Sequence, residues 1–132
     1  AAAAPDLPLL AGGKSMGGRM TSLAASKSPL EEVSGLVFLG FPLHPAGKPG
    51  TDRARHLANV GLPMLFLQGT RDRLADSSLL APVIDELGPT ARLHVVQGGD
   101  HSFKVLKRSG RTDAAVLEEL AETVTEWIGQ FT

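Results

Sequence analysis

The sequence predicts an α/β domain in which a parallel β-sheet of about four strands has helices on its faces. Two observations support this. Short apolar runs bounded by glycine or proline recur along the chain, and such runs are typical of strands covered on both faces. Segments with apolar residues at helical spacing lie between them. Strands that alternate with helices are joined by right-handed crossovers, so we expect the strands to be parallel.

Four strands are expected, at residues 8–12, 35–40, 63–69 and 93–96. The second is continuously apolar between glycines, and the third, from Pro63 to Gly69, repeats this buried-strand pattern. A strand of this kind has no polar face to turn toward solvent, so helices should cover both faces of the sheet.

The first helix is predicted over residues 16–27. Its apolar residues recur at helical spacing and are expected on the buried face: Met16, Met20, Leu23 and Ala24. The helix should end before Pro29, because the residue preceding a proline disfavours the α conformation. Residues 41–50 hold three prolines and two glycines and should form a loop. Residues 1–4 are expected to be the tail of a helix that Pro5 stops.

Three further helices are predicted. A short one is capped by Thr51 and runs to about Val60. The next begins at a cap among Asp76, Ser77 or Ser78 and carries one apolar stripe up to Gly88. The last runs from about residue 113 to 130. Its buried face is expected to hold Leu117, Leu120, Ala121, Val124 and Ile128.

Composition narrows the possible functions. The 132 residues are one domain's worth of chain, with a net charge of −1 and no basic block, so neither nucleic acid nor a membrane surface is expected as a partner. No apolar run is long enough to span a membrane, and the first residues lack the features of a signal peptide. The absence of cysteine excludes disulfides and thiolate metal sites. A cytoplasmic enzyme or binding domain is expected.

The segment Gly13-Lys14-Ser15-Met16-Gly17 follows the first predicted strand directly and has the G-x-S-x-G pattern of a nucleophile elbow. In an elbow the serine sits on a strained turn between strand and helix, and glycines on both sides permit the close contact. The backbone N–H of Met16, at the helix start, would then stabilise a developing oxyanion.

This segment has two other interpretations. Gly13-Lys14-Ser15 also matches the end of a phosphate-binding P-loop, but that motif needs a glycine five positions earlier, where Pro8 stands. An ordinary glycine-rich turn with a solvated serine remains as the alternative.

Two polar residues follow later strands. Asp72 comes after the third strand in Gly69-Thr70-Arg71-Asp72, and His101 comes after the fourth. Because the carboxyl ends of parallel strands lie at one edge of the sheet, we expect both to meet Ser15 there. A serine nucleophile needs a histidine base and a carboxylate that orients it. Asp76 is the alternative acid, and Asp100 is expected only to form a turn.

The remaining candidates carry weaker signals. Lys14 is expected to be solvated, although it could contact an acidic substrate. His44 would either line the substrate pocket or bond to loop carbonyls. His56 and His94 are expected to have no function. No pair of histidines has the i, i+4 spacing of a helical zinc site, so neither a metal nor another cofactor is expected.

Three motifs in this order resemble the α/β-hydrolase superfamily: Gly-x-Ser-x-Gly, then Gly-Thr-Arg-Asp, then Gly-x-Asp-His-Ser-Phe. Small dienelactone-hydrolase-like members are the most similar, and Gly-Lys-Ser-Met-Gly-Gly-Arg with Phe-Pro-Leu-His-Pro is similar to a subgroup of predicted hydrolases. The resemblance implies an α/β-hydrolase fold with Ser15 as nucleophile, Asp72 as acid and His101 as base. The function would be a serine hydrolase (carboxylesterase or acyl hydrolase type) that cleaves an ester, thioester or amide of a small-molecule acyl substrate through an acyl-enzyme. The alternative is a non-catalytic binding or scaffold module.

The resemblance also implies something about the segment that precedes the elbow. The superfamily has four further strands before the elbow, and a loop among them supplies the second oxyanion-hole N–H. We therefore expect residues 1–132 to be a single α/β-hydrolase domain that lacks its N-terminal strands. The strand at residues 8–12 would then present an unpaired edge. An upstream segment of the same protein, or a second copy of the chain, is expected to cover it.

Overall fold

A computed structural model describes residues 9–131, so the helix expected at residues 1–4 lies outside the described residues. Four strands form one parallel sheet in the order β1-β2-β3-β4. They are β1 (Leu9–Lys14), β2 (Val33–Leu39), β3 (Met64–Gly69) and β4 (Ala91–Val96). The predicted parallel sheet with flanking helices is confirmed.

Both outer strands extend beyond their predicted bounds. β1 continues over Gly13 and Lys14, which pair with Phe38 and Leu39 of β2. β4 begins at Ala91, which pairs with Met64 of β3. The reason is that ladder hydrogen bonds join backbone groups and continue past the apolar residues by which a strand is recognised.

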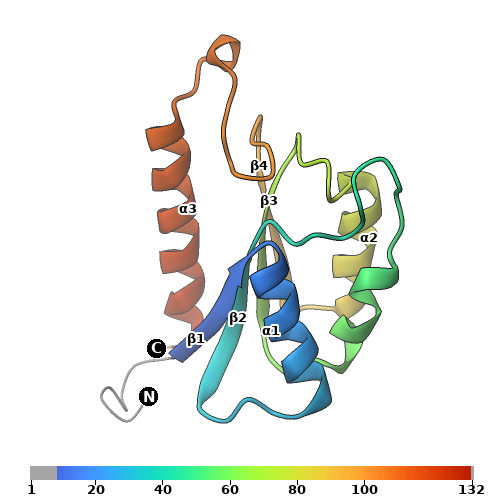
Figure 1. Ribbon diagram of the computed structural model, residues 1–132. Coiled ribbons are helices and arrows are strands. Elements are labelled where there is room, and N and C mark those ends of the chain that lie inside the picture. The colour runs from blue at the N-terminus through green and yellow to red at the C-terminus, as the bar shows by residue number, and fades with distance from the viewer. Residues whose placement is uncertain (1–8, 132) are drawn as a thin grey trace.

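Helices cover both faces of the sheet (Figure 1). α1 (Met16–Lys27) and α2 (Ser77–Leu87) lie on one face, and α3 (Asp113–Ile128) lies on the other. Because side chains alternate along a strand, each strand serves two cores. Phe38 and Phe66 pack with ring centroids 4.7 Å apart beneath α1 and α2. The second core, beneath α3, is made of Leu65, Leu67, Val96, Phe103, Val116, Leu120 and Trp127.

The buried face of α1 differs from the prediction. Gly18, Ser22 and Ala25 are buried, whereas Met16 is 45% exposed and Met20 is 57% exposed. The helix lies so close to β1 that a Cβ on Gly18 would come within 2.6 Å of the Gly13 carbonyl oxygen. Only small residues fit at that distance, so the methionines face away from the sheet.

The buried face of α3 also differs. Val116, Leu120 and Trp127 are buried, while Leu117 is 66% exposed and Ala121 is exposed as well. Trp127 is the largest side chain of the helix, and seating its ring in the core selects the face that meets the sheet. The expected burial of Leu117 and Ala121 was therefore wrong, and that of Leu120 was right.

The other two predicted helices are found where they were expected, but the first of them is of a different type. Residues after Thr51 form a 3-10 helix, η1 (Asp52–Asn59), and the Thr51 side chain makes no capping hydrogen bond. Leu57 is buried as expected. α2 begins at the predicted cap, where the Asp76 carboxylate accepts a hydrogen bond from the amide of Ser78.

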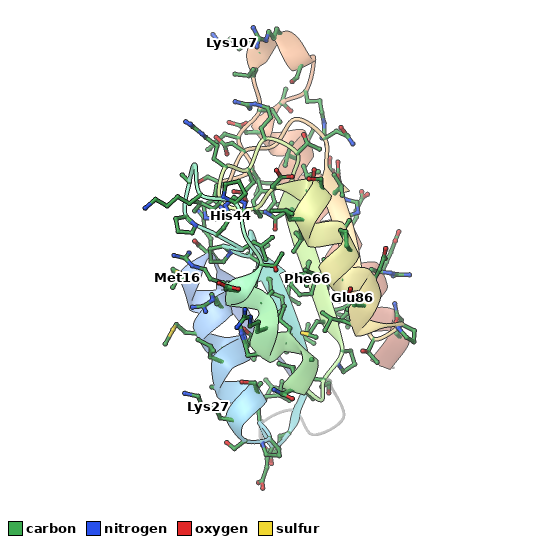
Figure 2. The ribbon with its side chains drawn as sticks, turned by 90° about the vertical axis from the view of Figure 1, so that its right-hand side faces the viewer. Met16, Lys27, His44, Phe66, Glu86 and Lys107 are labelled. Carbon is green, nitrogen blue, oxygen red and sulfur yellow. The ribbon has the colours of Figure 1, made fainter. Side chains whose placement is uncertain are left out.

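The loops after β1, β3 and β4 leave the sheet at its carboxyl edge, at the top of Figure 1. Met16 and Lys27 mark the two ends of α1, and Lys107 lies at the tip of the outermost loop (Figure 2). Within residues 9–131, no helix combines the length and apolar character that crossing a membrane requires.

Candidate active site

Ser15 occupies a strained turn between β1 and α1. Its backbone angles are φ 54° and ψ −124°, a region that residues other than glycine rarely adopt. Two hydrogen bonds hold this conformation. The Ser15 amide donates to the Leu39 carbonyl at 3.0 Å, and the Ser15 carbonyl accepts from the Arg19 amide at 3.2 Å. The side chain is half-buried, at the first turn of a helix whose initial N–H groups have no partner within the helix.

The glycine before Ser15 is crowded as expected, whereas the glycine two residues after it is not. A Cβ on Gly12 would lie 1.9 Å from the Val37 carbonyl oxygen, and one on Gly13 would lie 3.0 Å from the Gly18 nitrogen. At Gly17, within the described part of the chain, an added Cβ would meet nothing within 4 Å. The crowded glycine on the helix side of the elbow is therefore Gly18. No contact among the described residues requires a glycine at Gly17.

His101 lies in the loop after β4, which Asp100 organises. The Asp100 Oδ1 atom accepts hydrogen bonds from the amides of Ser102 and Lys104, both at 2.9 Å, as expected for a turn former. The loop packs closely on the sheet, because a Cβ on Gly69 would lie 2.1 Å from the Gly99 carbonyl oxygen. A Cβ on Gly40 would come within 3.3 Å of the His101 ring. Glycine at both positions lets the ring approach the sheet edge.

Asp72 follows β3, and its side chain is fully buried. One oxygen, Oδ1, accepts from the Leu74 amide at 2.8 Å. The other, Oδ2, accepts from Gln68 Nε2 at 2.5 Å and from His101 Nδ1 at 2.8 Å. A buried carboxylate is costly unless it is hydrogen-bonded, and here every bond also orients it.

The three predicted residues meet in one line of hydrogen bonds. His101 Nε2 lies 2.8 Å from Ser15 Oγ, and His101 Nδ1 lies 2.8 Å from Asp72 Oδ2. A carboxylate can only accept, so Nδ1 carries the proton. In the neutral ring Nε2 then accepts from the Ser15 hydroxyl. This arrangement can remove the hydroxyl proton and stabilise the imidazolium that results.

Gln68 is a site residue that the sequence interpretation missed. It is 2% exposed near the end of β3, and while its Nε2 donates to Asp72, its Oε1 accepts from the Phe41 amide at 3.1 Å. Gln68 thereby connects the Asp72 carboxylate to the loop after β2. The signal was present in the sequence: Gln68 is a polar residue at the end of a continuously apolar strand, and it needs a buried partner.

The structure brings Asp72, and not the alternative Asp76, to His101. The Asp76 carboxylate caps α2, and hydrogen bonds from the Ser78 hydroxyl and amide hold its pKa below the ordinary value. His44 is 4% exposed, and its ring links its own loop to the first residue before α2. Its Nδ1 donates to the Pro45 carbonyl at 2.9 Å, and its Nε2 accepts from the Asp76 amide at 2.8 Å. Both ring nitrogens of His44 are thus engaged in holding backbone.

The other two histidines have structural partners. His56 Nε2 lies 2.6 Å from Ser22 Oγ beneath α1, and burial, followed by repulsion from Arg19, lowers the pKa of His56. His94 of β4 bonds to Glu119 of α3 at 2.6 Å. Burial alone would raise the pKa of Glu119, but hydrogen bonds from His94 and Arg111 outweigh it and hold that pKa below its ordinary value.

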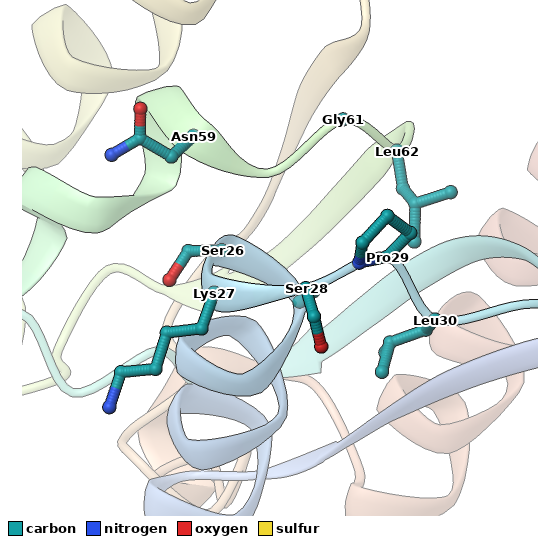
Figure 3. Close-up of a pocket in the computed structure, with 9 residues that line it drawn as sticks. Ser26, Lys27, Ser28, Pro29, Leu30, Asn59, Gly61 and Leu62 are labelled. Atoms are coloured by element: carbon teal, nitrogen blue, oxygen red, sulfur yellow. The ribbon is translucent and has the colours of Figure 1, made fainter.

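Cavities lie at both ends of the sheet. One of about 470 Å³ includes His44, Asp72 and Asp76 in its lining, and one of about 280 Å³ opens at His101. A third, of about 330 Å³, lies where α1 ends, between Ser26–Leu30 and the Asn59–Leu62 turn (Figure 3). Of the described residues that line this cavity, Lys27 alone is titratable, and it lies at the opposite end of α1 from Ser15. Among the described residues, no three His, Asp or Glu side chains form a group that could hold a metal ion.

The parallel sheet, the strained serine after β1 and the polar residues after β3 and β4 define the class of an α/β-hydrolase-type domain. Residues 1–129 match the family model described as an alpha/beta hydrolase domain. The chain belongs to this family, within the α/β-hydrolase superfamily.

Solved structures share the fold. A putative dienelactone hydrolase from Klebsiella pneumoniae is 20% identical with a TM-score of 0.64, over 92% of this chain and 52% of that one. An esterase from Thermogutta terrifontis is 19% identical with a TM-score of 0.53, over 89% and 54%. The esterase domain of a Rhodothermus marinus protein is 16% identical with a TM-score of 0.56, over 73% and 53%. The chain thus spans about half the length of each.

A curated relative gives a different kind of match. The cysteine–tRNA ligase of Beutenbergia cavernae is 32% identical over 111 residues, which are 83% of this chain and 22% of that protein. Because the match spans about a fifth of the ligase, it carries no activity over to this chain.

Proposed function

We propose that this chain carries the catalytic residues of a serine hydrolase that cleaves an ester, thioester or amide through an acyl-enzyme. The observation that carries the proposal is the hydrogen-bonded line from Ser15 Oγ through the His101 ring to Asp72 Oδ2, with 2.8 Å at each step. Membership of the alpha/beta hydrolase domain family supports hydrolytic activity in general. The strained backbone of Ser15 supports its role as nucleophile.

The reaction follows from the positions of the protons. Ser15 Oγ attacks the carbonyl carbon of the substrate while His101 Nε2 takes the hydroxyl proton, and Asp72 stabilises the imidazolium. As the tetrahedral intermediate collapses, His101 gives the proton to the departing oxygen, sulfur or nitrogen atom. Water, deprotonated by His101, then attacks the acyl carbon. As the bond from that carbon to Ser15 Oγ breaks, His101 returns the proton to Oγ and the acid is released.

The oxyanion needs donors that face it. The Met16 N–H, immediately after the nucleophile in the first turn of α1, supplies one. A second donor would come from a segment outside the described residues. In this proposal the chain is therefore one part of an α/β-hydrolase domain, and the part that covers the free edge of β1 completes the site.

Covalent labelling tests the nucleophile. The full-length protein should react with a fluorophosphonate probe at Ser15, and Ser15→Ala should abolish both labelling and ester turnover. Ser15→Ala and His101→Ala should each lower turnover by roughly 10⁴-fold or more, and the double variant by little further, because the two act as one unit.

Two serines of α1 provide matched controls. The Ser26 hydroxyl donates to the Leu23 carbonyl at 2.7 Å, at the far end of the helix from Ser15, so Ser26→Ala should label normally. Ser22 also contacts a histidine, His56, but it is fully buried and should not react. A folded protein that neither labels nor hydrolyses esters would contradict the proposal and favour a binding or scaffold module with this fold.

A further inference from the structure

Three cations surround the His101 side of the proposed active site. Arg71 and Arg73 flank Asp72 in the sequence, are exposed, and line both cavities at this edge. Lys14, in the elbow itself, reaches across the edge so that its Nζ lies 3.4 Å from the Ser102 hydroxyl, beside His101. Within residues 9–131 none of the three forms an ion pair.

Carboxylates that line the same cavities are already engaged. Asp72 accepts from Leu74, Gln68 and His101. Asp100 accepts from two amides of its own loop, and Asp76 caps α2. These carboxylates keep their negative charge, but the cavity that opens at His101 has two arginines and one carboxylate, Asp100, in its lining, so positive charge is in excess there. Cations in a concave site attract and orient an anionic ligand.

The position of the histidine determines which part of the substrate meets these cations. His101 Nε2 must reach the departing atom in order to protonate it, so the leaving group lies on the His101 side of Ser15. The cavity of about 280 Å³ opens there and is lined by Arg71, Arg73, Asp100, His101 and Ser102. A leaving group in this cavity comes within reach of both guanidinium groups, which bind carboxylate and phosphate oxygens through paired N–H donors.

We infer that the substrate carries an anionic group, a carboxylate or a phosphate, on its leaving group, and that Arg71, Arg73 and Lys14 select it. The inference rests on the proposed serine hydrolase function and names the substrate class of that same site. Arg71 is in part positioned already, because its Nη1 donates to the Gly98 carbonyl at 3.1 Å. Among residues 9–131 the Arg73 side chain has no such bond, so its guanidinium is less restrained than that of Arg71.

Matched esters test the inference in the full-length protein. All share an acetyl group and differ in the leaving group: methyl 4-acetoxybenzoate is neutral, 4-acetoxybenzoate bears a carboxylate, and 4-acetoxyphenyl phosphate bears a phosphate. At low ionic strength, kcat/KM for at least one anionic ester should exceed that for the neutral ester by about tenfold, and the better of the two identifies the anion. Added salt should reduce this preference, because it screens exposed charges, and should leave the neutral ester unaffected.

Variants then assign the effect to residues. Arg73→Gln and Arg71→Gln should each lower the ratio of anionic to neutral kcat/KM by about threefold, and the double variant by about tenfold, as for exposed charges of modest individual strength. Arg73→Lys should retain most of the preference. Arg55→Gln removes the same charge from η1, where Arg55 pairs with Asp52 and lines neither cavity, so the ratio should not change.

The outcomes separate the two proposals. If Ser15 labels and all three esters are hydrolysed at equal kcat/KM, or if Arg55→Gln lowers the ratio as much as Arg73→Gln, the substrate inference is overturned and the hydrolase function stands. If Ser15 does not label and no ester is cleaved, the hydrolase function fails and this inference falls with it.

Discussion

At the scale of single residues, the carboxylate that meets His101 is held by its neighbours before any substrate arrives. Gln68 and the Leu74 amide leave Asp72 Oδ2 directed at His101 Nδ1. Gln68 also bonds to the Phe41 amide, so the loop after β2 and the carboxylate are positioned together. The orientation of His101 therefore depends on the buried Gln68 amide as well as on Asp72.

The acid can be tested by an isosteric change. Asp72→Asn should leave the fold intact, because the amide has the same shape, but it should favour the wrong tautomer of His101. A loss on the order of 10⁴ in turnover is expected by analogy with a comparable triad. Asp76→Asn should cost far less, since Asp76 only caps α2. Rates of ester hydrolysis for the two variants decide the matter, and a greater loss at Asp76 would show that the acid is misassigned.

At the scale of elements, the contact between β1 and α1 determines where Ser15 stands. The helix approaches the strand through Gly13 and Gly18, with no space for a methyl group between them. Because Ser15 lies between these two glycines in the sequence, any increase in the separation of strand and helix moves the serine away from His101.

Two neighbouring glycines of α1 should respond oppositely to alanine. Gly18→Ala places a Cβ 2.6 Å from the Gly13 carbonyl oxygen, so it should lower the free energy of unfolding by about 1–3 kcal/mol, as overpacking does, and reduce activity. Gly17→Ala meets nothing within 4 Å in the described residues and should stabilise the helix by up to about 1 kcal/mol. Urea unfolding measures both. Strong destabilisation by Gly17→Ala would mean that another segment packs on α1 there.

The packing of η1 on α1 should depend on pH through His56. Burial and the nearby Arg19 lower its pKa from 6.5, so the unfolded chain binds the proton more readily than the folded one. The free energy of unfolding should therefore fall as the pH drops below about 6.5, with the loss ending below the folded-state pKa. His56→Gln should remove this component in thermal unfolding measured from pH 7.5 to 5.

A separate acid loss is expected at lower pH. The pKa of Glu119 lies below its ordinary value of 4.5, so its contribution is present above 4.5 and is lost as the pH falls through the folded-state pKa. Glu119→Gln should remove the loss of stability below pH 4.5 and keep the loss near pH 6 that belongs to His56.

The two variants check each other. If thermal unfolding of His56→Gln depended on pH between 7.5 and 5 as the unsubstituted protein does, His56 would not be the titrating group.

At the scale of the whole molecule, β1 is the edge of the sheet on the side that carries the serine, and within the described residues it pairs only with β2. Apolar side chains are exposed on this strand and on two of the helices: Leu9 of β1 is 39% exposed, Met20 of α1 57%, and Leu117 of α3 66%. An apolar, unpaired strand edge is a template for association. We propose that an upstream segment of the same protein or a second copy of the chain covers it.

Expression of residues 1–132 alone tests this proposal. The fragment should associate or be inactive, and adding the upstream segment should restore solubility and activity if that segment is the partner. If the upstream segment supplies the second oxyanion donor, its removal should by itself cost roughly 10²–10³ in rate. Light scattering, thermal unfolding and esterase assays follow the outcome. A monodisperse, cooperatively folding and active monomer would refute the proposal.

The sequence by itself determined the order of strands and helices, because apolar runs and helical spacing reflect backbone hydrogen bonding within each segment. It also placed Ser15, Asp72 and His101 at one edge, since each follows a parallel strand. Only the tertiary structure decided that α1 buries Gly18 instead of Met20, that α3 exposes Leu117, and that Gln68 holds Asp72. These outcomes depend on which distant segments meet and how closely they approach, and local periodicity does not encode that.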